Sequence, residues 1–364
     1  MKIKLTDGMF TPREELFAEE GGLKAVLFRY ESGICCVRLE NSRGHISVLP
    51  FNGQMVWDAV MDGRSLKMKT TYDMPKPAAL FRDTYGCYVM HCGILAMGCP
   101  CEQDTHAHHG ELPYADYDKA YIETGEDGKG KYIAVTGEYE YNRAFDSHYI
   151  ARPFAKLYED STLIDVGINV ENLARGPMDV MYMCHVNGNV ADHSKLYQTL
   201  PWDSDHMVVR VSIPQYNEPD PVFLKLLDDV QNDVRVTRAI GLADQYDPEI
   251  VLFLRDVMAD EHGMAHFVYE HRDGTSDYVT YDAGVLDKAV RWMVNHKDWR
   301  SMGFVLPSTA EPEGYIAEKA KGNVRSLPGG ETFSAQVTCG CLDARQTAQV
   351  KDKIKSILGK EWID

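Results

Sequence analysis

The sequence has no apolar run long enough to cross a membrane. A spanning helix needs roughly 20 consecutive apolar residues, and polar or charged side chains interrupt every stretch of this chain well before that length. Residues 1–8 alternate apolar with charged or polar side chains and lack the apolar centre of a secretory signal. We therefore expect no membrane partner.

Positive charge is also scarce. The 38 Lys and Arg residues face 55 Asp and Glu residues, which gives a formal net charge of −17 at pH 7. Phosphate backbones repel a protein with such a charge, so nucleic acid is not an expected partner. GxGxxG, Walker and GxSxG motifs are missing as well, which argues against dinucleotide-binding, P-loop and α/β-hydrolase folds.

Nine cysteines are present, but their spacing matches neither a disulfide framework nor a zinc site. One residue separates Cys99 from Cys101 and Cys339 from Cys341, whereas paired zinc ligands usually follow a C-x2-C pattern. Free cysteines often pack as small apolar side chains, and they stay reduced in the cytosol. The sequence therefore predicts mostly buried thiols in a cytoplasmic protein.

Short alternating segments, separated by Gly, Asn and Ser turns, fill most of the chain. Residues 25–50 show the pattern clearly, and Asp127-Gly-Lys-Gly is a typical hairpin turn. The pattern predicts about twenty short strands without alternating helices. We interpret this as an all-β fold, a single large antiparallel β-sandwich over residues 1–364, with two fused sandwiches as the alternative.

Two segments depart from the strand pattern. Residues 68–113 are rich in Pro, Gly, Cys and His, and long irregular segments in compact domains are usually functional, so we expect them to form a cleft wall. Residues 343–359 predict a C-terminal helix, with Asp343 as N-cap, Gly359 as C-cap and apolar side chains on one face. A second short helix is expected around residues 223–229.

Three polar clusters follow apolar segments and are candidates for chemistry. A histidine titrates near neutrality, and a glutamate among apolar neighbours can have its pKa raised, so the two can act as general acid and base. The three clusters are His106-Ala-His108-His109-Gly-Glu111, His185-Val-Asn187-Gly-Asn189 and Ser308-Thr-Ala-Glu311-Pro-Glu313.

In order and spacing these clusters resemble the aldose 1-epimerase (galactose mutarotase) superfamily. That family has an Asn-containing turn 13 residues before its catalytic histidine, and here Asn172 precedes His185 by 13 residues. Its catalytic glutamate stands before a proline upstream of a Pro-Gly turn and the last strand, as Glu311 does. Its substrate-binding histidine precedes a glycine, as His109 does.

The resemblance implies a mutarotase-like supersandwich that interconverts the α and β anomers of an aldose. Glu311 would take the proton of the O1 hydroxyl while His185 protonates the ring oxygen. No metal or nucleotide cofactor is implied, the partner is a small sugar, and a homodimer is left open. The substrate-binding residues implied by the resemblance are His109, Asn187, His91, Arg82 and Glu111.

Several alternatives stay open at this stage. Glu313 competes with Glu311 as the base, and an acidic Glu111 in the cleft would disfavour an anionic sugar. His106, His108 and Glu111 are also metal-ligand types, which would suit a cupin-like metal-dependent isomerase. A catalytically idle carbohydrate-binding module of the same fold is the third possibility. Trp57, Trp292 and Trp299 are more often core residues than sugar-stacking platforms.

Overall fold

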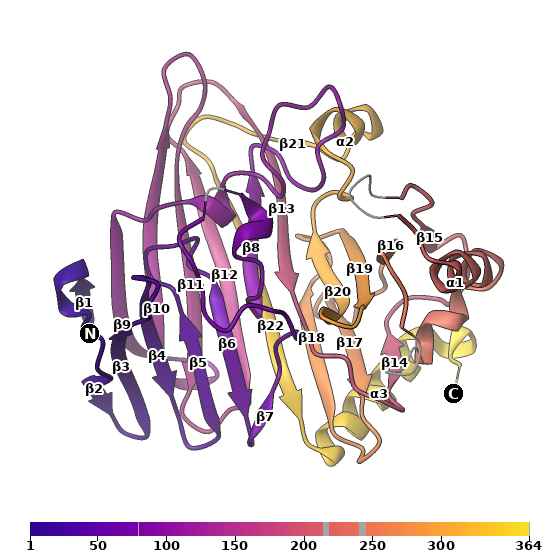
Figure 1. Ribbon diagram of the computed structural model, residues 1–364, viewed down its shortest axis with the longest axis horizontal. Coiled ribbons are helices and arrows are strands. Elements are labelled where there is room, and N and C mark those ends of the chain that lie inside the picture. Colours follow the sequence, from indigo (N-terminus) through magenta and orange to yellow (C-terminus); the bar gives the residue numbers. More distant parts are fainter. Residues whose placement is uncertain (79, 214–217, 240–244, 364) are drawn as a thin grey trace.

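Two antiparallel β-sheets pack face to face in the computed structural model, which describes residues 1–78, 80–213, 218–239 and 245–363 (Figure 1). The first sheet has nine strands, in the spatial order β1 (Lys2–Leu5), β9 (Lys119–Asp127), β10 (Gly130–Asn142), β11 (His148–Tyr158), β12 (Leu163–Asn172), β22 (Thr332–Leu342), β18 (Ser276–Asp282), β17 (Met264–Glu270) and β14 (Lys195–Gln198).

The second sheet has thirteen strands. Its main path is β15 (Met207–Val209), β16 (Ile250–Arg255), β19 (Lys288–Asn295), β20 (Arg300–Ser308), β13 (Met178–Val186), β8 (Val89–Ile94), β6 (Val56–Met61), β5 (Gly44–Val48), β4 (Cys35–Glu40), β3 (Leu23–Arg29) and β2 (Glu15–Glu20). Off this path, β21 (Arg325–Leu327) pairs with β13 and β7 (Arg64–Ser65) with β6. The predicted all-β antiparallel sandwich is confirmed.

Helices are few. They are α1 (Pro221–Asn232), α2 (Tyr315–Lys321) and α3 (Ala344–Leu358), with 3-10 turns η1 (Asp7–Met9), η2 (Phe81–Asp83), η3 (Leu112–Tyr114), η4 (Val234–Ala239) and η5 (Gly359–Glu361). The predicted C-terminal helix is confirmed, because Asp343 and Gln346 form a capping box and Gly359 is the C-cap. The helix expected near residues 223–229 lies within α1. None of the helices in the described ranges is long and apolar enough to cross a membrane.

Strand β13 is buried on both faces, and this determines where its side chains point. Val180, Tyr182 and Cys184 join the apolar core between the two sheets. Met181 and Met183 join a second apolar cluster on the other face of the thirteen-stranded sheet. Alternate residues of a strand share a face, so the next odd-numbered residue, His185, projects on the side of the second cluster.

The outer face of the thirteen-stranded sheet is covered by loops. Between η2 and η3, residues 84–111 contain only strand β8 and otherwise irregular backbone, as the Pro- and Gly-rich composition predicts. Backbone hydrogen bonds join this segment to the loop after β20, for example from Cys99 N to Pro312 O at 3.0 Å. The two segments together close over the sheet where β13 and β20 meet.

Candidate active site

A cavity of about 410 Å3 lies on this outer face. Residues of β13, β16, β19 and β20 and of the loops around β8 and β16 line it. The charged and imidazole side chains that line it belong to Arg82, His108, His109, His185, Arg210, Asp247, Glu249 and His296. Its aromatic lining consists of Tyr85, Trp292 and Trp299. Small-molecule pockets usually measure roughly 300–1,000 Å3, so the cavity suits a compact polar ligand.

His185 lies in the wall of the cavity and is only 4% exposed. Its ring meets the edges or faces of three others, with centroids 5.2 Å from His109, 5.4 Å from Trp292 and 6.0 Å from Tyr85. Its Nδ1 atom has no hydrogen-bond partner in the described part of the chain. Burial lowers the pKa of His185 to about 3, against a smaller opposing effect of Asn187. The resting side chain is therefore a neutral imidazole.

The second predicted histidine, His109, belongs to a loop whose backbone is tightly held. Its N–H donates to Gly98 O and its carbonyl accepts from Gly93 N, both at 2.9 Å. His109 has a φ of 61°, a left-handed conformation that is uncommon for residues other than glycine. The adjacent His108 also lines the cavity. Burial, and then the neighbouring His185, lower the pKa of His109 well below its usual range.

A carboxylate that the sequence did not single out, Glu249, lines the cavity. Trp292 Nε1 donates to Glu249 Oε2 at 2.7 Å, and Arg210 forms an ion pair with the other oxygen. Glu249 directly precedes β16, in an Asp-Pro-Glu turn before an apolar strand. That polar turn before an apolar strand was the available signal, and it was not singled out from the sequence.

Glu311, the predicted base, is not among the described residues that line the cavity, although Pro312 is. Its side chain is 2% exposed, with Oε1 at 2.5 Å from Arg255 Nε and Oε2 at 2.7 Å from Lys321 Nζ. Burial raises the pKa of Glu311, but the hydrogen bonds from Arg255 and Lys321 outweigh it and leave this pKa below its usual range. Glu311 is therefore an ionised carboxylate with a cation on each oxygen.

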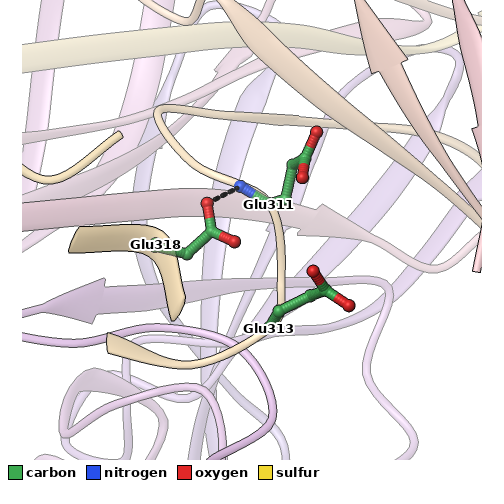
Figure 2. A group of neighbouring side chains, drawn as sticks. All are labelled: Glu311, Glu313 and Glu318. Atoms are coloured by element: carbon green, nitrogen blue, oxygen red, sulfur yellow. Dashed lines mark hydrogen bonds between the residues drawn. The ribbon is translucent and has the colours of Figure 1, made fainter. Parts of the chain in front are cut away.

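Three glutamates surround the ammonium group of Lys321. Its Nζ lies 2.7 Å from Glu311, 2.6 Å from Glu313 and 2.8 Å from Glu318. Figure 2 shows Glu311 and Glu313 on the loop after β20 and Glu318 on α2, with a hydrogen bond from Glu311 N to the Glu318 carboxylate. Within the described chain, these glutamates form the one group of three His, Cys, Asp or Glu residues whose ligand atoms lie within 4.8 Å of one another. A lysine already neutralises part of their charge.

His106, His108 and Glu111, the metal ligands of the cupin-like alternative, do not form a metal site. His106 Nδ1 lies 2.8 Å from Ala107 O. The carboxylate of Glu111 accepts hydrogen bonds from the backbone N–H groups of Ile94 and Leu95. His106, His108 and Glu111 therefore do not converge on one point, so this geometry does not support a metal site built from them.

The remaining predicted binding residues fall into two classes. Arg82 lines the cavity. Asn187 and His91 lie behind its wall: Asn187 Oδ1 accepts from Tyr85 O–H at 2.9 Å, and His91 Nδ1 lies 2.8 Å from Tyr182 O–H. Burial lowers the pKa of His91 to about 4, as expected for an imidazole deep in the protein. The structure thus brings His185, His109 and Arg82 to the cavity and leaves Asn187, His91, Glu111 and Glu311 outside its lining.

Solved structures with the same architecture span nearly the whole chain. A Klebsiella pneumoniae subsp. pneumoniae protein, provisionally named an aldose 1-epimerase, superposes with a TM-score of 0.81 at 14% identity, over 100% of this chain and 97% of the other. A galactose mutarotase-like protein from Clostridium acetobutylicum gives 0.59 at 13% identity, over 88% and 99%. This chain has the galactose mutarotase-like fold. The mutarotase-like fold predicted from the sequence is therefore confirmed.

A third solved structure has the same fold. A galactose mutarotase-like protein from Lactobacillus casei covers 84% of this chain and 100% of its own, with 15% identity and a TM-score of 0.53. No family model matches the sequence, and no curated protein matches it either. At such low sequence identity the similarity establishes the mutarotase-like fold alone, because one fold can carry many activities.

Proposed function

We propose that the protein is a carbohydrate isomerase that interconverts the α and β anomers of an aldose by acid–base catalysis. The observation that carries the proposal is the position of His185, a neutral imidazole in the wall of a cavity of about 410 Å3. Its Nδ1 atom makes no hydrogen bond within the described residues. A buried imidazole in such a cavity can exchange a proton with a bound hydroxyl group.

The aromatic wall supports a sugar as the ligand. The rings of Tyr85 and Trp299 are 6.3 Å apart at an interplanar angle of 19°, and Trp292 lies 5.6 Å from Tyr85. Aromatic rings give large, rigid apolar surfaces, and Tyr and Trp also have a polar atom for hydrogen bonding. A pyranose, with its apolar C–H face and polar edge, matches this combination.

The charge of the cavity supports a neutral sugar. Its two arginines, Arg82 and Arg210, are matched by the two acidic residues Asp247 and Glu249. Burial keeps His185 and His109 neutral, as their lowered pKa values indicate. A cavity with balanced charge presents donors and acceptors to hydroxyl groups without favouring a strongly anionic ligand.

Ring opening requires that O1 lose its proton, that the C1–O5 bond break, and that O5 gain a proton. In this proposal neutral His185 takes the O1 proton, the electrons of the C1–O5 bond go to O5, and the imidazolium returns the proton to O5. Rotation about C1–C2 and the reverse sequence give the other anomer. His185 therefore acts first as a proton acceptor, because its pKa of about 3 disfavours a protonated resting state.

A carboxylate near the cavity would stabilise the transient imidazolium. The resemblance implies that Glu311 itself takes the O1 proton, whereas Glu249 is the carboxylate that lines the cavity. Both stay candidates in the proposal, and paired Glu→Gln variants distinguish them.

The test measures the rate of anomer exchange for a panel of aldoses by two-dimensional exchange NMR. Each rate is compared with the uncatalysed rate. We expect the wild type to accelerate exchange of at least one neutral aldose, and His185→Asn to reduce kcat/KM by about 10²–10⁴-fold. His193→Asn is the matched control, because the side chain of His193 is 66% exposed and away from the cavity. A wild type that binds aldoses without accelerating exchange would support the idle binding module instead.

A further inference from the structure

Glu111 shares one carboxylate oxygen among three donors from different parts of the fold. Its Oε1 accepts hydrogen bonds from Ile94 N at 2.9 Å, Leu95 N at 3.0 Å and Tyr149 O–H at 2.5 Å. Ile94 ends β8 in the thirteen-stranded sheet, and Tyr149 belongs to β11 in the nine-stranded sheet. One side chain therefore links the loop that carries the cavity histidines to both sheets.

The surroundings of Tyr149 make it a fixed donor. Its side chain is fully buried and stacks on Tyr141, with ring centroids 5.1 Å apart and an interplanar angle of 6°. Burial, and then the charge of Glu111, raise the pKa of Tyr149 well above its usual range. The hydroxyl stays protonated and points its hydrogen bond at Glu111, because a buried phenol retains its proton.

The backbone between Glu111 and the two histidines leaves little freedom. Gly110 has a φ of 82°, and a Cβ atom there would lie 2.2 Å from Ala96 O. Glu111 N donates to Gly93 O at 3.1 Å. A change in the position of Glu111 is therefore transmitted along a short, closely packed backbone to His109 and His108.

We propose that Glu111 is a positioning residue that sets the orientation of His108 and His109 in the cavity. This rests on the proposed function, because it assumes that these histidines contact the sugar. It changes the role expected from the sequence: the carboxylate faces backbone amides and Tyr149 rather than a ligand. Its charge therefore gives no reason to exclude an anionic sugar.

The experiment compares Glu111→Ala with Glu111→Gln in the full chain. The alanine variant leaves three donors without an acceptor, whereas glutamine keeps one oxygen that can accept from Ile94 N and Leu95 N. We expect Glu111→Ala to lower kcat/KM about 10–100-fold, mainly through KM, and Glu111→Gln to restore most of the loss. Glu261→Gln is the matched control, because that side chain is 77% exposed.

A second readout separates positioning from folding and from activity. In ¹H–¹⁵N spectra of the imidazole rings, Glu111→Ala should shift the signals of His108 and His109 and leave that of His271 unchanged. If Glu111→Ala does not fold, Tyr149→Phe removes one donor only and should shift the same two signals by less. Unchanged His108 and His109 signals, with or without a lower melting temperature, would overturn the proposal.

The same design distinguishes this inference from the proposed function. A wild type without anomer exchange would refute the proposed function, while shifted His108 and His109 signals in Glu111→Ala would still support positioning. Full exchange activity in Glu111→Ala, with the histidine signals unmoved, would refute positioning and leave the proposed function standing.

Discussion

Two carboxylates near the cavity, Glu249 and Glu311, differ in what surrounds them. Glu249 lines the cavity and is held by Arg210 and by the indole N–H of Trp292. Glu311 is 2% exposed and has a cation on each oxygen, with Lys321 shared among three glutamates. A carboxylate that stabilises the imidazolium of His185 must have its charge close to the cavity. In this structure Glu249 meets this requirement, and Glu311 has the position in the sequence that the resemblance predicts.

The comparison shows how one residue type serves two purposes. Glu311 forms ion pairs with Arg255 of β16 and with Lys321 of α2, so its carboxylate has a structural role in connecting these two elements. The Glu249 pair presents an oriented carboxylate to a cavity.

Among the changes that bear on this comparison, the largest effect is expected from replacing Glu249 with glutamine. Glu249→Gln should lower kcat/KM about 100-fold, because the cavity loses the carboxylate that stabilises the imidazolium. Glu311→Gln should lower kcat/KM less than about fivefold, since its side chain is outside the cavity lining. Exchange NMR on both variants measures the difference, with Glu313→Gln as the control. The opposite ranking would show that Glu311 is the base, as the resemblance predicts.

A stability effect should follow when the Glu311 cluster loses its lysine. Lys321→Met leaves Glu311, Glu313 and Glu318 facing one another without the shared ammonium. Because Lys321 is partly exposed, we expect the free energy of unfolding to fall by about 2 kcal/mol, less than for a fully buried pair. Urea denaturation measures this change. Lys319→Met is the matched control, since the side chain of Lys319 is 58% exposed. Equal losses of unfolding free energy in both variants would contradict a structural role of the Lys321 ion pairs.

A smaller effect should come from the indole N–H that holds Glu249. Trp292→Phe keeps an aromatic wall but removes the donor to Glu249 Oε2, and a hydrogen bond to a charged group contributes about 1.5–3 kcal/mol. Since Arg210 still holds the carboxylate, we expect kcat/KM to fall only about 3–10-fold. Trp299→Phe is the control, because it makes the same change of ring and leaves the hydrogen bond from Trp292 to Glu249 in place. Similar losses in the two variants would show that ring area, rather than the hydrogen bond, is what matters.

The smallest effect is expected from changing the pH. Neutral His185 is the active form in the proposal, and its pKa of about 3 lies far below neutrality. The rate should therefore stay within about twofold between roughly pH 5 and pH 8 and fall only as the pH approaches 3. Exchange rates corrected for the uncatalysed reaction test this. A rate that rises steadily as the pH falls from 7 to 5 would show that the imidazolium is the starting donor.

The fold was predictable because its signals are local. Alternating side chains and turn residues define each strand, and Asp343 and Gly359 mark both ends of α3. Helix α2 was not predicted, since the preceding Pro-Glu-Gly and its seven-residue length give a turn-like pattern. Ion pairs of Lys321 with Glu311 and of Lys319 with Asp179 connect α2 to other parts of the fold.

The site was predictable in part. His185 stood out because it ends an apolar strand, and His109 because it precedes a glycine as the resemblance requires; the structure brings both to one cavity. Glu249, Arg210 and Trp292 come from three separate parts of the chain and meet only when β15, β16 and β19 pair. No local sequence pattern indicates that these three side chains come into contact, so the contact could not be predicted from the sequence.

By itself the sequence determined the antiparallel strands and the C-terminal helix, because strand periodicity and capping depend on neighbouring residues. Tertiary structure alone decided which carboxylate reaches the cavity and which is fastened to α2. It also directed the Glu111 carboxylate toward the amides of Ile94 and Leu95. Burial, ion pairing and pKa depend on groups that are distant in the chain, and only the packed sheets bring those groups together.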